Sequence, residues 1–249
     1  MTAPPVLTGP SGRPIDRDSG KTLRLPIIHQ RLVETYGDGV IELNWTTPLE
    51  LLIATVLSAQ STDVMVNKIT ASLFQKYHEP EDYLAVPQEE LEQDIKSSGF
   101  YRQKAKSIRG LCAGILERFD GDVPQTIAEL ITLPGVARKT ANVVQSGAFP
   151  EAMATDPDAG IAVDTHVIRL SKRLGYTRHS DAVKIEQDLK RMYPRDQWSN
   201  ASLVTILHGR RCCDALKPAC YRCPVETLCP SSLAAGRTDK ARQARGMGE

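Results

Sequence analysis

Three features are absent from the 249-residue sequence, and each absence excludes a class of protein. Charged residues interrupt every apolar run well before it reaches membrane-spanning length, and residues 1–20 lack the apolar core of a signal peptide. There is no repeat of fixed period and no coiled-coil heptad. The formal net charge is only +1, so a nucleic-acid-binding surface has to come from charges gathered on one face. We therefore expect a soluble, unexported protein of the cytoplasm.

The remaining composition predicts a helical protein with one large core or two modest lobes. Hydrophobic residues make up 41% of the chain, which is enough for either arrangement. Apolar residues recur with helical spacing, and capping residues precede them; Thr47 before Pro48, for example, marks the start of an almost wholly apolar helix. Residues 147–160 hold prolines and aspartates without a helical period, so we expect a loop there. We predict an all-α fold in which residues 1–20, rich in proline and glycine, form a flexible tail.

The most informative stretch is residues 133–144, where a Pro-Gly turn separates two apolar, helix-compatible segments. This pattern is typical of a helix-hairpin-helix, in which Gly135 relieves crowding in the turn. Backbone N–H groups beside the helix start, together with Arg138, form a ready site for a phosphate. Lys139 falls in the first turn of the second helix, where the dipole and partial burial would lower its pKa. A neutral lysine can form a Schiff base, whereas an isolated lysine is more often a solvated surface residue.

Three other places in the chain have both a structural and a functional interpretation. Gln60 projects from a corner between two helices and is either a loop residue or a side chain that fills the space left by a displaced base. Phe100 and Tyr101 follow a glycine corner and are either core residues or a wedge between base pairs, with neighbouring cations such as Lys104 at the phosphates. Asp164 begins a helix and is either its cap or a carboxylate that faces the hairpin lysine across a cleft.

Four of the six cysteines crowd into one short, proline-rich segment near the C-terminus. Their spacing, C-x6-C-x2-C-x5-C, lets four thiolates close around one metal centre without help from the rest of the chain. In an unexported protein this favours a metal site over a disulfide scaffold. Ligand chemistry alone leaves tetrahedral zinc and a [4Fe–4S] cluster both open, and it leaves Cys212 spare. The four predicted ligands are Cys213, Cys220, Cys223 and Cys229.

Together, these residues resemble endonuclease III, a family of the helix-hairpin-helix DNA glycosylase superfamily. The resemblance rests on residues 133–141, 163–166 and 57–60 and on the cysteine spacing, and it covers most of the chain. It implies a [4Fe–4S] cluster rather than zinc, and two helical lobes with DNA bound across the cleft between them. The implied parts are a six-helix barrel with the hairpin at 44–150, a discontinuous cluster domain at 21–43 and 151–230, and a second flexible tail at 231–249.

The resemblance also implies an activity, the excision of oxidised pyrimidines from double-stranded DNA followed by strand cleavage. Lys139 would be the nucleophile that attacks C1′ of the deoxyribose, and Asp164 would be the carboxylate that assists it. The resulting Schiff base would allow β-elimination 3′ to the abasic site. The protein would act as a monomer without a membrane partner, associated with the nucleoid if the source is bacterial. The implied DNA contacts are Gln60 in the vacated space, Phe100 and Tyr101 as wedge, Lys104, the hairpin residues Leu133, Gly135, Ala137, Arg138 and Thr140, and His166.

A few residues depart from the family pattern, and three other interpretations compete with it. Ala137 replaces a second hairpin glycine, Ile131 replaces a polar residue, and the loop at 149–160 is longer; these departures bear on lesion preference and DNA contacts. An adenine-removing mismatch glycosylase would lack a lysine at the position of Lys139 and would carry a further C-terminal domain. A noncatalytic hairpin DNA-binding protein has no need of Asp164, and an electron carrier has no need of the hairpin.

Overall fold

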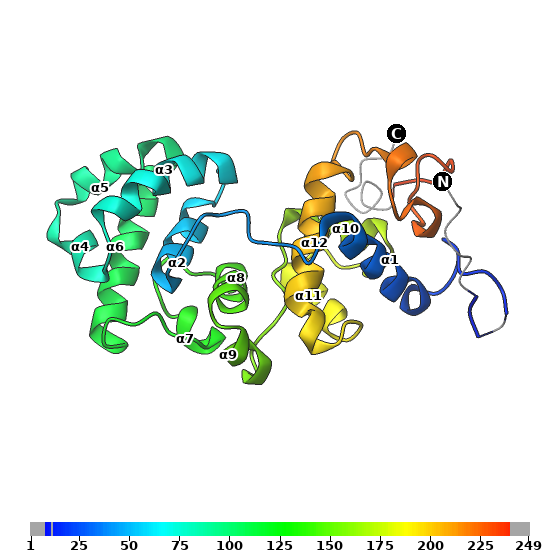
Figure 1. Cartoon of the computed structure of the whole chain (residues 1–249), viewed down its shortest axis with the longest axis horizontal. Helices are drawn as coiled ribbons and strands as arrows, with labels where there is room; N and C mark the ends of the chain where they lie inside the picture. Colours follow the sequence, from blue (N-terminus) through cyan, green and yellow to red (C-terminus); the bar gives the residue numbers. More distant parts are fainter. Residues whose placement is uncertain (1–7, 11, 240–249) are drawn as a thin grey trace. The chain divides into compact units, whose positions relative to one another are not determined.

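The computed structural model describes residues 8–10 and 12–239, and these form a helical protein (Figure 1). Within the described residues the sole β feature is an isolated bridge between Thr8 and Pro14. The all-α prediction is therefore confirmed. The chain divides into two compact units. We call Ile41–Ala162 the hairpin unit, and the residues up to Val40 together with those from Val163 onward the cysteine unit.

In the hairpin unit, helices begin where the sequence supplies a cap. Thr47 accepts a hydrogen bond from the Glu50 amide at 3.2 Å, and the Glu50 carboxylate accepts one from the Thr47 amide at 3.3 Å, which is a capping box before Pro48. Thr62 and Thr126 also cap helices through their hydroxyls. The helices of this unit are α2 (Pro48–Leu57), α3 (Asp63–Lys76), α4 (Pro80–Ala85), α5 (Gln88–Asp94), the 3-10 helix η1 (Lys96–Ser98), α6 (Tyr101–Arg118), α7 (Ile127–Leu130), α8 (Arg138–Ala148) and α9 (Pro150–Thr155).

Apolar burial holds the hairpin unit together. One continuous cluster of buried side chains runs through it, and Leu51, Leu52 and Ile53 on α2 and Ile108 and Leu111 on α6 are completely buried. Burial of each such side chain is worth roughly 1.5–3 kcal/mol. Helix α8 packs against α2, so the helix that carries the predicted nucleophile rests on an almost wholly buried neighbour.

The cysteine unit is a group of helices around α12, which packs against both α1 and α10. The Asp164 carboxylate caps α10 by accepting a hydrogen bond from the Val167 amide at 2.8 Å. No described helix of either unit is long and apolar enough to cross a membrane. The elements of the cysteine unit are α1 (Lys21–Tyr36), α10 (Thr165–Arg173), α11 (Ala182–Lys190), α12 (Trp198–Arg211) and the 3-10 helices η2 (Arg195–Gln197), η3 (Cys220–Arg222) and η4 (Glu226–Leu228).

Residues 147–160, expected to form a loop, contain the short helix α9. Its first residue is a proline, whose fixed φ suits the start of a helix. Just beyond it, the buried Asp156 carboxylate accepts hydrogen bonds from the Ile127 amide at 2.8 Å and the Gln145 side chain at 2.6 Å. The loop expectation was wrong here because six helical residues are too few to show a period. These bonds also explain why the hairpin unit extends beyond its expected boundary.

Parts of the two expected tails pack onto the cysteine unit. Asp239 is 4% exposed, and its carboxylate forms an ion pair with Arg173 at 2.6 Å. Near the other end of the chain, Arg17 pairs with Glu226 at 3.2 Å. These segments are anchored because each meets a charged partner far away in the sequence, which local proline and glycine content does not reveal. The remaining parts of the expected tails, residues 1–7, 11 and 240–249, lie outside the described residues.

Candidate active site and metal site

The hairpin turn docks onto small residues of α6. Gly135 has a φ of +79°, and a Cβ there would lie 2.6 Å from the Cβ of Ser107. A Cβ on Gly110 would lie 3.0 Å from the hairpin proline, and one on Gly114 would lie 3.1 Å from Leu133. The three α6 residues share one face because they are spaced three and four apart. Ser107, Gly110 and Gly114 were not among the predicted site residues, although small residues at helical spacing can be recognised in the sequence.

Lys139 is the second residue of α8 and follows the turn directly. The preceding N-cap residue, Ala137, has an extended backbone, and its side chain supplies no hydrogen bond to the first turn. Lys139 is half-buried, and Arg138 beside it donates a hydrogen bond to the Asp158 carbonyl at 3.0 Å. The start of α8 thus combines two cations with the positive end of a helix dipole, an arrangement that favours a phosphate group.

The other predicted hairpin contacts differ in exposure. Leu133 is 2% exposed and Thr140 is 9% exposed, so their side chains support the hairpin from within. Gly135 and Ala137 are exposed. A ligand at this turn would therefore meet backbone atoms of the turn and the side chains at the start of α8.

The two predicted DNA-inserting corners lie at the ends of short turns in the hairpin unit. Gln60, just after α2, is exposed and has a φ of +54°. Phe100, just before α6, is 69% exposed and has a φ of +48°. Such left-handed conformations are uncommon for residues other than glycine. Tyr101 is only half-buried but packs against the core, so Phe100 is the better placed of the two aromatic candidates for a wedge.

The expected phosphate contact by Lys104 is not what the structure shows. Lys104 is 5% exposed, and its Nζ donates hydrogen bonds to the carbonyls of Leu57 and Ser98, both at 2.8 Å. Burial lowers the pKa of this lysine from its ordinary value. The prediction failed because a cation in a basic segment gives no sign of which residues turn inward on the folded helix.

Asp164 and His166 belong to the cysteine unit, whereas Lys139 belongs to the hairpin unit. Asp164 is half-buried and acts as the predicted helix cap. The Nδ1 of His166 lies 3.1 Å from Nη2 of Arg169, and burial lowers the pKa of this histidine. A Cβ on Gly209 would lie 2.7 Å from the same Nδ1, so the imidazole packs directly on the α12 backbone.

All four predicted metal ligands line a single cavity of the cysteine unit, whereas Cys212 is not among its lining residues. Arg173 lines the cavity as well, and its guanidinium donates to the Cys213 sulfur at 3.2 Å and to the Cys213 carbonyl at 3.3 Å. Burial raises the pKa of the Cys229 thiol to about 11, and a nearby cation or metal ion favours the thiolate. Four cysteines that line one cavity suit a four-thiolate metal centre.

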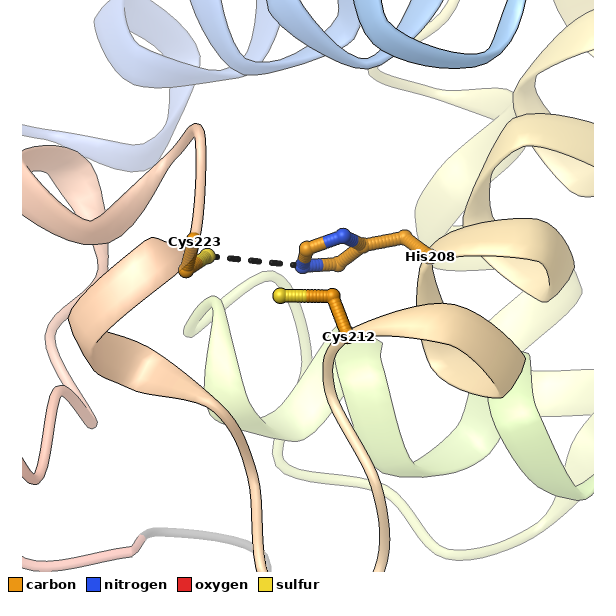
Figure 2. A group of neighbouring side chains, drawn as sticks. All are labelled: His208, Cys212 and Cys223. Carbon is orange, nitrogen blue, oxygen red and sulfur yellow. Dashed lines mark hydrogen bonds between the residues drawn. The ribbon is translucent and has the colours of Figure 1, made fainter.

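At this cavity, Figure 2 shows His208 from α12 and Cys212, the residue directly after that helix, facing Cys223. The ligand atoms of these three residues lie within 4.8 Å of one another, and His208 Nε2 is 3.6 Å from the Cys223 sulfur. The other ring nitrogen of His208 lies 2.9 Å from the Tyr36 hydroxyl, and burial lowers the pKa of His208 to about 4. A neutral imidazole in this position orients Cys223, a partner that the cysteine spacing alone did not reveal.

Comparison with known proteins agrees with this architecture. Residues 53–195 match the HhH-GPD superfamily of base excision DNA repair proteins. The endonuclease III of Synechocystis is 49% identical over 203 residues, which cover 82% of this chain and 90% of that protein. A solved non-covalent complex of endonuclease III with DNA is 45% identical, with a TM-score of 0.80, covering 86% of this chain and 98% of that chain. A trapped covalent endonuclease III–DNA intermediate is 46% identical, with a TM-score of 0.80, covering 87% and 99%.

The chain therefore belongs to the HhH-GPD superfamily of base excision DNA repair proteins and, within it, to the endonuclease III family. It is an enzyme of base excision repair, a DNA glycosylase and AP lyase. The resemblance inferred from the hairpin, the capping aspartate and the cysteine spacing is confirmed.

Proposed function

We propose that the enzyme removes oxidised pyrimidines from double-stranded DNA through Lys139 and then cleaves the strand 3′ to the resulting abasic site. The observation that carries this proposal is the position of Lys139, the second residue of α8, directly after the hairpin turn. The trapped endonuclease III–DNA complex is a covalent intermediate, which supports a reaction step with a covalent bond between enzyme and DNA. We further propose that the protein acts as a monomer.

The reaction needs a nucleophile and a stabilised leaving base. The Lys139 amine, in its neutral form, attacks C1′, the N-glycosidic bond breaks, and the base leaves with its electron pair and takes up a proton. Loss of the remaining amine proton and opening of the sugar ring give a Schiff base between Nζ and C1′. Removal of a proton from C2′ then expels the 3′ phosphate by β-elimination. Pre-existing abasic sites enter the same sequence without the base-release step.

Asp164 supplies the carboxylate of the proposed site. Its Oδ1 is fixed by the Val167 amide at the start of α10, so the side chain is held in one orientation. A carboxylate held in this way stabilises positive charge that develops on the sugar and accepts a proton from the attacking amine. The helix-capping bond and the catalytic role are compatible because a carboxylate has two oxygens.

DNA binding is proposed to use the hairpin and the two corners of the hairpin unit. Backbone N–H groups at the turn and Arg138 hold a phosphate, Gln60 occupies the space left by the displaced nucleotide, and Phe100 enters between base pairs. Insertion of an apolar wedge and extrusion of a base each cost a few kcal/mol, less where pairing is already weakened. Damaged positions are favoured for that reason.

The four cysteines of the cavity are proposed to hold a [4Fe–4S] cluster. Such a cluster would hold the cysteine segment together and, at a suitable reduction potential, would transfer electrons. Arg173 holds the first ligand through the Cys213 carbonyl, and His208 orients Cys223. No step of the reaction at the sugar requires the centre.

Borohydride trapping tests the proposal. The parent protein, Lys139→Ala and Asp164→Asn are incubated with duplexes that carry one oxidised pyrimidine or one abasic site, and the exposed Lys68→Ala on α3 is the matched control. We expect a covalent adduct with the parent and with Lys68→Ala, none with Lys139→Ala, and slow base release by Asp164→Asn. Base release without an adduct by the parent would replace the proposal with a monofunctional glycosylase. Neither base release nor an adduct would leave a DNA-binding protein.

A further inference from the structure

The buried ammonium group of Lys104 joins two parts of the hairpin unit that are distant in the sequence. It donates hydrogen bonds to two main-chain carbonyls, that of Leu57 at the end of α2 and that of Ser98 at the end of η1, each at 2.8 Å. The carbonyl groups that end a helix carry the negative pole of its dipole, so a cation is favoured there. Burial lowers the pKa of Lys104, which shows that this position is held at a cost in solvation.

Each of these two carbonyls belongs to a residue shortly before one of the exposed corners in the sequence. Leu57 is three residues before Gln60, which has a φ of +54°, and Ser98 is two residues before Phe100, which has a φ of +48°. Three non-glycine residues in the described part of the chain have a positive φ, and two of them are these corner residues. Backbone conformations of this kind persist only where the surrounding structure fixes them, and they concentrate at functional sites.

We propose that Lys104 is a positioning residue that locks the Gln60 corner and the Phe100 corner into one rigid element for insertion into duplex DNA. This inference rests on the proposed function. One ammonium group bonded to both segments fixes the distance between the corners before DNA arrives. Two independent corners would each have to be ordered during binding, which lowers the population of correctly inserted complexes. Lys104 therefore acts on base extrusion through the two corners and makes no contact with phosphate.

The same helix offers a matched control. Arg109, five residues after Lys104 on α6, also donates to main-chain carbonyls, those of Tyr83 at 2.8 Å, Val86 at 2.6 Å and Leu84 at 3.4 Å. These carbonyls belong to α4 and the residue that ends it, and neither corner is involved. Lys104→Met and Arg109→Met each remove one cation; the first leaves two carbonyls without that donor and the second leaves three. A general loss of stability should appear in both variants. Loss of insertion of the two corners into the duplex should appear only in Lys104→Met.

The experiment follows insertion directly. Full-length, cluster-containing parent protein, Lys104→Met and Arg109→Met are mixed with a duplex that carries 2-aminopurine opposite a stable tetrahydrofuran abasic analogue. Fluorescence of the aminopurine rises when side chains enter the duplex and unstack it. Single-turnover base release from an oxidised pyrimidine and affinity for undamaged duplex are measured beside it, at a temperature where thermal melts show every variant folded.

With Lys104→Met we expect most of the fluorescence rise to be lost and base release to slow by about tenfold or more, as small misplacements do at reacting sites. Affinity for undamaged duplex should stay within about twofold, because phosphate contacts supply most of it. Arg109→Met should match the parent, and Lys104→Arg should recover part of both signals. If Lys104→Met does not fold, Lys104→Gln, which keeps a donor, replaces it.

Two results would overturn the inference. Equal losses in Lys104→Met and Arg109→Met would show that Lys104 has only a general structural role, and parent-like insertion and rate in Lys104→Met would show that it has no role in positioning. A parent protein with neither base release nor a fluorescence rise would refute the proposed function itself. Base release by the parent with a parent-like Lys104→Met would refute only the positioning role.

Discussion

The two units of the chain are stabilised by different kinds of interior. In the described residues of the hairpin unit, two charged side chains of lysine, arginine, aspartate or glutamate are buried, Lys104 and Asp156. The cysteine unit buries six such side chains within the described part of the chain. These are Arg24, Arg169, Lys172, Arg173, Glu186 and Asp239.

The buried arginines of the cysteine unit hold irregular backbone in place. Arg24 donates to the carbonyls of Leu174 and Leu228, both at 2.9 Å, and Arg173 donates to the Asp214 carbonyl at 2.6 Å. Turns around a metal site bury few apolar groups, so charge-assisted hydrogen bonds and metal ligation have to supply the stability. The hairpin unit, in contrast, draws its stability from apolar burial. We therefore expect the two units to respond differently to metal loss, charge removal and pH.

One tryptophan in each unit allows the responses to be separated. Trp45 packs against the apolar core of the hairpin unit, and Trp198, 7% exposed, begins α12 of the cysteine unit. The chain has two tryptophans in all. Trp45→Phe and Trp198→Phe thus give proteins in which urea-induced fluorescence changes report one unit at a time.

The largest expected effect is that of removing the proposed metal centre. Cys220→Ser should abolish iron binding and destabilise the cysteine unit on the order of 10 kcal/mol, the scale on which structural metal sites contribute to folding. The transition reported by Trp198 should therefore shift to very low urea or disappear. The transition reported by Trp45 should remain close to that of the parent. Equal shifts of the two reporters would contradict the comparison between the units.

The next effect is that of breaking the buried ion pair of the cysteine unit. Asp239→Asn leaves the Arg173 guanidinium without its charged partner, and loss of one partner of a buried pair costs about 3–5 kcal/mol. We expect this loss in the free energy of unfolding measured at Trp198, together with faster release of iron to a chelator. The exposed pair of Arg237 and Asp18 is the control; Asp18→Asn should cost no more than about 1 kcal/mol. Similar costs for the two variants would show that burial of the pair is irrelevant.

A truncation in the apolar core should affect the other unit. Leu52 on α2 is completely buried, so Leu52→Ala should lower the free energy of unfolding measured at Trp45 by about 3 kcal/mol through lost burial and a cavity. Urea titration of the protein that carries Trp45 alone checks this value. A loss well below about 1 kcal/mol would mean that apolar burial is not what stabilises this unit.

The smallest effect is a pH dependence confined to the cysteine unit. Burial lowers the pKa of His29 below its ordinary value of 6.5, and its Nδ1 has no hydrogen-bond partner among the described residues. Between pH 6.5 and the lower folded-state pKa the unfolded chain binds a proton that the folded chain does not, so stability is full above pH 6.5 and falls as the pH falls. Burial acts in the same direction on His166 and His208.

Urea titrations at pH 7.5 and pH 5.5 measure this dependence. We expect the free energy of unfolding measured at Trp198 to be lower at pH 5.5 than at pH 7.5, because the unfolded chain binds protons that buried histidines of the folded chain do not. The hairpin unit has one histidine, the exposed His78, and should lack this contribution. His29→Leu should weaken the dependence, and an unchanged slope in that variant would remove His29 from the explanation.

The sequence by itself determined the features that depend on residues within one helical turn or one short segment. Thr47 caps the helix that begins at Pro48, as predicted, and Asp164 caps α10, because each cap needs only backbone groups up to three residues away. The hairpin turn and the cysteine spacing were readable for the same reason, and together they were specific enough to identify the family.

The tertiary structure alone decided which distant groups meet. Lys104 binds a carbonyl 47 positions away, and Arg173 pairs with Asp239, 66 positions away. A lysine in a basic segment and an aspartate in an expected tail have the local signals of exposed residues, so the sequence predicted a phosphate contact and a flexible end. Their burial became favourable only when packing brought carbonyls and a counter-charge to them. An ionised group is buried only where such partners compensate for its lost hydration.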